Sequence, residues 1–263
     1  MQIFFRALLA IYLGHLLADF VFQPPRLVSQ KRSGGVRAYL IHGLAHFFAT
    51  LILLAFFVRG SATMARTYFV LLALSLVHLL FDFAKIRITQ RGLIPDGARA
   101  YLLDQLLHAF TVFLGAWLLS PGVSFSNVAA FIGIVRSFPA GFLLVPVIYV
   151  AVMFGGGYLI RDFTRALSEG VKRHSPEKSA EQLQNAGLYI GWLERFLVIT
   201  ALLLHSPASI GLILTAKSIA RYPEFKSEHF AEYFLIGTLL SIAMAILGGI
   251  ILVRVIFGAV RFS

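Results

Sequence analysis

The sequence predicts an all-α protein, a polytopic transmembrane helical bundle of about eight spans. Hydrophobic residues make up 59% of the 263-residue chain and charged residues 13%, and the mean hydropathy is +0.83. This is more apolar than a soluble domain needs to fill its core. Apolar runs such as 38–58 and 233–253 have the length of about twenty residues that a helix needs to cross hydrocarbon.

Eight apolar runs are interrupted by polar or turn-forming residues. They place spans at 3–22, 38–58, 67–86, 101–119, 139–160, 187–205, 207–220 and 232–257. The first run contains His15 and Asp19 and has no small-residue cleavage site after it, so we interpret it as a retained span. Residues 128–138 are apolar but short, which favours a re-entrant or interfacial segment over a ninth span.

Basic residues gather in alternate loops. The loops 23–37, 85–100 and 161–186 are rich in Lys and Arg, whereas 59–66 and 120–127 hold few. By the positive-inside rule the basic loops are cytoplasmic and both termini lie outside, although Arg254 and Arg261 disagree. We therefore expect a multi-pass protein of the cell inner (plasma) membrane.

Composition shifts divide the chain into four parts. We expect a four-helix membrane unit at 1–120, a re-entrant or interfacial segment plus a span at 121–160, a cytoplasmic hydrophilic segment at 161–186, and C-terminal membrane helices at 187–263.

Charge and cysteine content exclude several functions. The formal net charge of +11 lies in short loops between spans, which indicates membrane topology and contact with membrane lipid, not nucleic acid. The chain has no cysteine, so disulfides, thiolate metal sites and cysteine nucleophiles are excluded. Any metal ion must bind nitrogen and oxygen.

The first half contains an internal repeat. His15-Leu-Leu-Ala-Asp19-Phe recurs as His78-Leu-Leu-Phe-Asp82-Phe, and the His42/His46 pair is matched by Asp104/His108 at nearly the same offset. Two matches in the same order predict a duplicated helical hairpin. Its halves would be related by an axis along the membrane normal, with a site at their interface.

Each of the first four spans carries one His or Asp pair at a spacing of four, which places both side chains on one helix face. Chance placement would give about 0.6 such pairs in this chain. The topology brings all four pairs to one depth, near the cytoplasmic ends of the spans. They are His15/Asp19, His42/His46, His78/Asp82 and Asp104/His108.

Ionisable groups inside a bilayer are costly, and a bound divalent cation compensates them. Imidazoles mixed with carboxylates suit Zn, Mn or Fe(II) as one or two ions, with all eight side chains as candidate ligands. The alternative is a hydrogen-bonded polar network that holds the bundle together. Haem ligation is less natural, because carboxylates lie one turn from several of the histidines.

Other polar residues complete two candidate sets. Gln23, Lys31, Lys85 and Gln105 can orient ligands or hold an anionic substrate oxygen, although snorkelling to the interface also explains both lysines. A second set could bind an anion or a lipid headgroup, against the alternative of positive-inside placement. It consists of Glu194, Arg195, Lys217 and Arg221. His174, His205 and His229 receive no function.

The motif from Gly14 to Gln23, with Lys31 and the histidine and aspartate pairs, resembles an uncharacterised bacterial membrane family known as a domain of unknown function. The resemblance covers roughly 5–115, and the second half is similar to an extension of longer members. The spacing is also distantly similar to predicted inner-membrane metal-dependent hydrolases, which implies hydrolytic activity.

These observations favour a metal-dependent integral membrane hydrolase acting from the cytoplasmic side on an amphiphilic lipid or phosphoester substrate. The ion would activate water, and a carboxylate among Asp19, Asp82 and Asp104 that is not a ligand would act as general base. Two alternatives remain, an ion or small-solute transporter and a non-catalytic membrane assembly protein.

Overall fold

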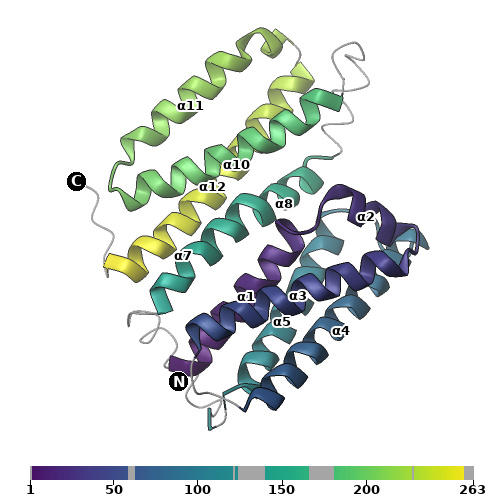
Figure 1. Cartoon of the computed structure of the whole chain (residues 1–263). Coiled ribbons are helices and arrows are strands. Elements are labelled where there is room, and N and C mark those ends of the chain that lie inside the picture. The colour runs from purple at the N-terminus through teal and green to yellow at the C-terminus, as the bar shows by residue number, and fades with distance from the viewer. Residues whose placement is uncertain are drawn as a thin grey trace. The chain divides into compact units, whose positions relative to one another are not determined.

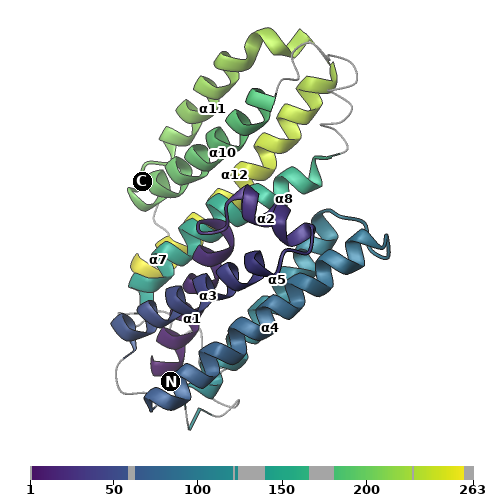
Figure 2. The ribbon, with the colours of Figure 1, turned by 45° about the vertical axis from the view of Figure 1, so that its right-hand side comes forward.

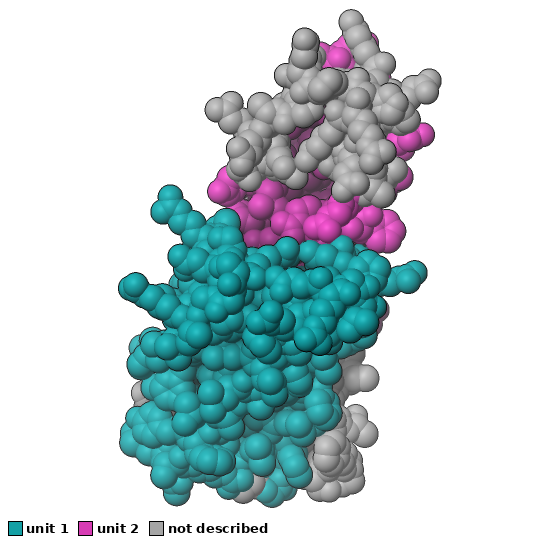
Figure 3. All heavy atoms as spheres, turned by 90° about the vertical axis from the view of Figure 1, so that its right-hand side faces the viewer, with its two compact units in different colours: residues 1–150 teal, residues 151–263 magenta. Residues whose placement is uncertain are grey.

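The computed structural model describes residues 2–58, 63–120, 122–123, 140–165, 181–226 and 228–257, and over these ranges it is helical with no strand. The chain divides into two compact units, residues 1–150 and 151–263, coloured separately in Figure 3. The segment 128–138 and most of 161–186 lie outside the described residues. The division of the sequence into four parts therefore remains a prediction.

The first unit is a ring of four long helices, labelled in Figure 1. They are α1 (Gln2–Phe20), α3 (Val36–Phe57), α4 (Met64–Gln90) and α5 (Ala98–Leu118). Helix α1 packs against α3 and α5, and α4 packs against the same two helices. Helices α1 and α4 share one repeated motif, and α3 and α5 share the other. The two helices of each pair therefore lie opposite each other in the ring. Helix α7 (Ala140–Val150) packs against α1.

Polar side chains of α3 face the interior of the four-helix unit, and apolar side chains cover its outer face. Along α3, His42, His46 and Thr50 are buried. The opposite face exposes five large apolar side chains at a spacing of four: Leu40, Leu44, Phe48, Ile52 and Phe56. Lipid makes such a surface favourable, because hydrocarbon solvates apolar side chains and penalises polar ones.

In the described part of the chain, six helices are long and apolar enough to cross a membrane, so the chain is a membrane protein. They span Gln2–Phe20, Val36–Phe57, Met64–Gln90, Ala98–Leu118, Phe142–Phe163 and Phe230–Phe257. The expected count of eight is not confirmed. Helix α11 (Ala208–Arg221) has 14 residues, which gives about 21 Å at 1.5 Å per residue, short of a hydrocarbon core of about 30 Å. Helix α10 (Glu181–Leu203) has 23 residues and is not among the six.

The second unit contains α10, α11 and α12 (Glu228–Phe257), together with α8 (Gly156–Phe163) and two short irregular helices. One of these, η2 (Ala151–Gly155), is a π-helix, and the other, η4 (Tyr222–Lys226), is a 3₁₀ helix. Helix α12 packs along α10.

A short helix, α2 (Pro25–Arg32), lies at the end of the ring between α1 and α3, as Figure 2 shows. It begins at Pro25, the first helical position, where proline has no hydrogen bond to lose. It ends before Gly34, whose φ of 84° is the left-handed conformation that glycine adopts freely. The Gln90 amide donates to the Arg32 carbonyl at 2.8 Å and anchors α2 to α4.

Glycines let the helices approach closely beside the buried histidines. A Cβ on Gly14 would lie 2.5 Å from the Thr50 hydroxyl, and one on Gly43 would lie 2.8 Å from Leu79 Cδ1. Small residues are the usual means of close helix contact in membranes. The close contacts hold the neighbouring His15 and His42 inside the ring.

Candidate metal centre

All eight predicted His and Asp residues meet inside the ring. The pair of α1 lies near the end of that helix, the pair of α4 ends eight residues before the end of α4, and the pairs of α3 and α5 begin six residues after the start of each helix. The five histidines are at most 5% exposed. They are joined by Asp19, Asp82 and Asp104, of which Asp104 is 7% exposed. The helical spacing of four explains the convergence, because each pair faces the centre of the ring.

Asp19 is the centre of the histidine-rich side. Its Oδ1 atom lies 2.9 Å from Nε2 of His46, 3.2 Å from Nε2 of His42 and 3.3 Å from Nε2 of His78. The Nε2 atoms of His42 and His78 are 3.0 Å apart. His15 is more distant, with Nε2 at 3.7 Å from Asp19 Oδ2. Three imidazoles from two helices therefore surround one carboxylate oxygen of a third.

These separations are close to those between neighbouring ligands of a small divalent ion. Bonds of about 2.0–2.1 Å from zinc to nitrogen and oxygen place neighbouring ligand atoms about 3.3–3.4 Å apart. The three separations from Asp19 Oδ1 and the one between His42 and His78 run from 2.9 to 3.3 Å, slightly shorter than this spacing.

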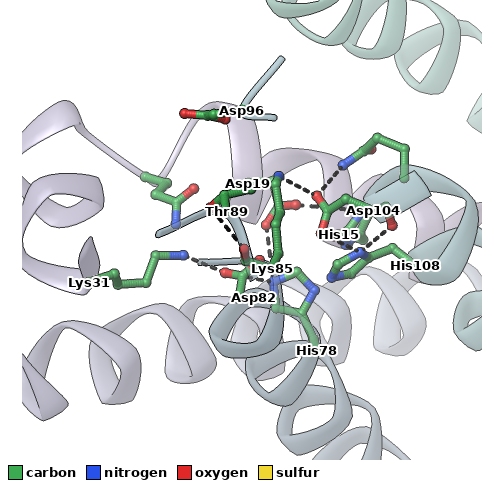
Figure 4. A network of polar contacts seen from close by, with 12 residues as sticks. His15, Asp19, Lys31, His78, Asp82, Lys85, Thr89, Asp96, Asp104 and His108 are labelled. Atoms are coloured by element: carbon green, nitrogen blue, oxygen red, sulfur yellow. Dashed lines mark hydrogen bonds and ion pairs between the residues drawn. The ribbon is translucent and has the colours of Figure 1, made fainter. Parts of the chain in front are cut away.

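Three groups of side chains among the described residues have ligand atoms within 4.8 Å of one another. They are His15, Asp19, His46 and His78; His42, His78 and Asp82; and Asp82, Asp104 and His108. Figure 4 shows how residues of these groups share one network.

A small cavity adjoins the centre on its inner side. Its volume is about 30 Å³, and it is lined by His15, His46, His78 and His108 together with apolar side chains. A cavity of this size holds a water molecule where polar groups line it. Three hydroxyl-bearing residues, Thr50, Ser75 and Thr111, also line it. The cavity is therefore polar where it meets the histidines.

Several imidazole nitrogens beside the cavity have no hydrogen-bond partner within the described part of the chain. They are His15 Nε2, His78 Nδ1 and His108 Nε2, all buried. His108 Nδ1 donates to the Asp104 carbonyl at 2.7 Å, so its Nε2 carries the lone pair. Buried polar atoms are nearly always satisfied, so these nitrogens indicate a place for a bound ion or water.

The other two carboxylates are paired with lysines. Lys31 Nζ lies 2.5 Å from Asp82 Oδ2, and Lys85 Nζ lies 2.8 Å from Asp104 Oδ2 (Figure 4). Lys31 is 4% exposed and the Lys85 side chain 32%. Imidazoles surround the Asp19 carboxylate, whereas Asp82 and Asp104 each form an ion pair with a lysine ammonium group.

The remaining predicted neighbours also join the network. Gln105 Nε2 donates to Asp104 Oδ2 at 3.4 Å. In the amide orientation that satisfies both of its ends, Gln23 donates to the Asp19 carbonyl and accepts from Lys31. All four residues predicted to support the centre are therefore beside it.

The residues predicted to bind an anion or a lipid headgroup lie in the second unit and have different partners there. Glu194 and Lys217 form a pair at 2.6 Å, with Glu194 3% exposed. Arg195 instead donates to the Met153 carbonyl of the π-helix, at 2.8 Å from Nη2, and to Ser241 at 3.0 Å. Arg221 lies at the end of α11. A headgroup site at these residues remains a prediction.

Sequence reasoning did not identify the hydroxyls that line the cavity. The spacing contains a signal for them, since Thr50 follows His46 by four positions, Thr111 follows His108 by three and Ser75 precedes His78 by three. Extending the search for polar residues one turn inward from each histidine would have found them. The helix α2 that carries Lys31 was also missed.

Residues 7–134 match the model of a protein family described as a protein of unknown function, DUF3307. The resemblance of the N-terminal half to an uncharacterised domain is thereby confirmed. The match includes every residue of the candidate metal centre. No curated protein and no solved structure matches the chain.

Proposed function

We propose that the protein is a metal-dependent integral membrane hydrolase that acts on an amphiphilic lipid or phosphoester substrate from the cytoplasmic side of the inner membrane. One observation carries the proposal: three imidazole nitrogens lie within 3.3 Å of Asp19 Oδ1, beside a small cavity that is polar where it meets the histidines. A structural metal site is closed by its protein ligands, whereas a catalytic site keeps a position for water.

In this proposal the ion is held by four side chains around one point. They are Asp19, His42, His46 and His78. Imidazole with one carboxylate suits Zn, Mn or Fe(II). Haem does not suit the site, because a cavity of about 30 Å³ cannot contain a porphyrin. A bound divalent ion would lower the pKa of water, so that hydroxide could attack an ester, and it would polarise the substrate oxygen.

The chain's own residues hold the water and position the ligands. The unpartnered nitrogens of His15 and His108 can accept hydrogen bonds from water in the cavity. Asp82 and Asp104 hold the two ammonium groups beside the centre, so in this proposal they do not take the proton. This revises the expectation that a free carboxylate among Asp19, Asp82 and Asp104 acts as general base.

Two features support an amphiphilic substrate. The outer faces of α3 and α4 are apolar, so a lipid tail can lie against them in the bilayer. The Lys85 side chain is partly exposed at the end of the ring, where a polar headgroup would lie. The orientation toward the cytoplasm follows from the basic loops.

The test is elemental analysis of detergent-purified protein, followed by hydrolysis assays with phospholipid and polyprenyl phosphate esters. We expect wild type to bind Zn, Mn or Fe and the His42→Ala/His46→Ala variant to lose it. His205→Ala, which removes an imidazole from the second unit, is the control and should keep the ion. Hydrolysis should require the ion and be lost in Asp19→Asn.

The outcomes separate the alternatives. Wild type that is folded yet binds no metal after supplementation contradicts the proposal and favours a polar network that holds the bundle. A bound ion with no hydrolysis, but with metal-dependent flux in liposomes, favours a transporter. A bound ion that changes only the stability favours an assembly role.

A further inference from the structure

The carboxylate-rich side of the centre has the composition of a second metal site. Asp82, Asp104 and His108 have ligand atoms within 4.8 Å of one another. None of the three belongs to the four side chains around Asp19 Oδ1. Two-metal hydrolases place ions about 3.5–4 Å apart to stabilise both the attacking and the leaving oxygen. The chain could therefore be read as a two-metal enzyme.

The lysines argue against this interpretation. Lys31 and Lys85 each place an ammonium group within hydrogen-bond distance of a carboxylate that a second ion would need. The three carboxylates carry three negative charges and the two lysines two positive ones, so one negative charge remains. A single divalent ion brings the centre to one positive charge, whereas two would bring it to three. Uncompensated charge is costly in a buried membrane site.

Both lysines are held in place by the surrounding structure. Lys31 is on the buried face of α2 with Leu27, and its ammonium group also lies 5.9 Å from the centre of the Tyr39 ring. Lys85 Nζ lies 6.0 Å from the centre of the Tyr101 ring. Cations over aromatic rings at this distance are stabilised. Neither lysine is an extended surface side chain that reaches the centre by chance.

We propose that the centre binds one metal ion, and that Lys31 and Lys85 take the place of a second ion. This inference rests on the proposed function. With the ion bound, the net positive charge favours an anionic substrate group, and the partly exposed Lys85 is the residue that contacts it. The substrate class is therefore an ester with an anionic oxygen, such as a phosphoester.

The experiment measures metal stoichiometry by mass spectrometry in wild type, in Lys31→Met/Lys85→Met, and in two variants that remove each ion pair as a unit. These are Lys31→Met/Asp82→Asn and Lys85→Met/Asp104→Asn. All are loaded with Zn or Mn and freed of excess ion on a desalting column. Circular dichroism and size-exclusion chromatography verify folding.

We expect about one ion per chain in wild type and in both pair variants, because the ligands around Asp19 are intact. Lys31→Met/Lys85→Met leaves two carboxylates without cations and should bind about two ions. About two ions in wild type, or loss of the ion in a pair variant, overturns the inference. So does a folded double-lysine variant that still binds one ion.

These results are distinct from a failure of the proposed function, in which wild type binds no ion. If the double-lysine variant does not fold, wild type and the pair variants still decide between one ion and two.

Discussion

The buried ion pair between Lys31 and Asp82 gives the most quantitative prediction. The pair is 2.5 Å long, with the side chains 4% and 13% exposed. Lys31→Met removes the ammonium group and leaves a buried carboxylate without its cation. Breaking such a pair costs about 3–5 kcal/mol. At about 2–4 °C per kcal/mol for a unit of this size, the midpoint of thermal unfolding should fall by about 6–20 °C.

The assay is thermal unfolding in detergent with a chelator present, so that no ion replaces the missing charge. Trp117 lies in the first unit and Trp192 in the second, so a Trp192→Phe background reports the first unit alone by fluorescence. Lys31→Met/Asp82→Asn removes both charges and should recover most of the lost stability.

Arg32→Met is the matched control on the same helix. Arg32 pairs with Asp96 at 3.1 Å, but the side chains are 59% and 36% exposed. An exposed pair contributes about 0–1 kcal/mol. If Lys31→Met and Arg32→Met shift the midpoint equally, or if the double variant is no more stable than Lys31→Met, the role assigned to the buried pair is wrong.

Three further predictions concern packing and the cavity. Ser75→Leu fills the cavity without removing a ligand, so metal content should persist while hydrolysis falls about 10- to 100-fold; unchanged turnover would exclude the cavity as the place of water. Gly43→Val places a Cβ about 2.8 Å from Leu79 Cδ1, so it should lower the free energy of unfolding by about 1–3 kcal/mol. Adding Leu79→Ala makes room for the new side chain and should restore part of that stability. Arg195→Met should destabilise the second unit more than Ser241→Ala, which removes one hydrogen bond worth about 1 kcal/mol. Equal effects would show that the hydrogen bonds from Arg195 to the Met153 carbonyl do not stabilise the π-helix.

Much of the first unit could be predicted because two independent periodicities agree. The apolar runs locate α1, α3, α4 and α5, and the pairs at a spacing of four indicate which face of each helix is inside. His42 and His46 show this well, since both are buried while Leu40 and Leu44 are exposed. In a membrane, a polar residue at helical spacing indicates the interior as clearly as an apolar one does in a soluble protein.

The second unit and the connections were predicted less well. Length and composition decide whether a helix can cross a bilayer, and α11, with 14 residues, is short for a span. The direction of Lys31 depends on α2, which is too short to have a clear periodicity. A sequence window cannot show that Lys31 reaches Asp82, 51 positions away.

The assignment of ligands within the cluster also required the structure. Spacing selects His15 and His108 as readily as His42 and His46, because all face the ring. Only the distances separate the three imidazoles whose Nε2 atoms lie within 3.3 Å of Asp19 Oδ1 from His15 and His108.

The proposed centre binds a single metal ion through three imidazoles and the Asp19 carboxylate. X-ray absorption at the metal edge of the loaded protein measures this ligand set. We expect about four nitrogen and oxygen ligands at about 2.0–2.1 Å if the ion is zinc, with multiple-scattering features of about three imidazoles that diminish in His46→Ala. A shell of oxygen ligands without imidazole scattering, unchanged in His46→Ala, would show that the histidines do not bind the ion.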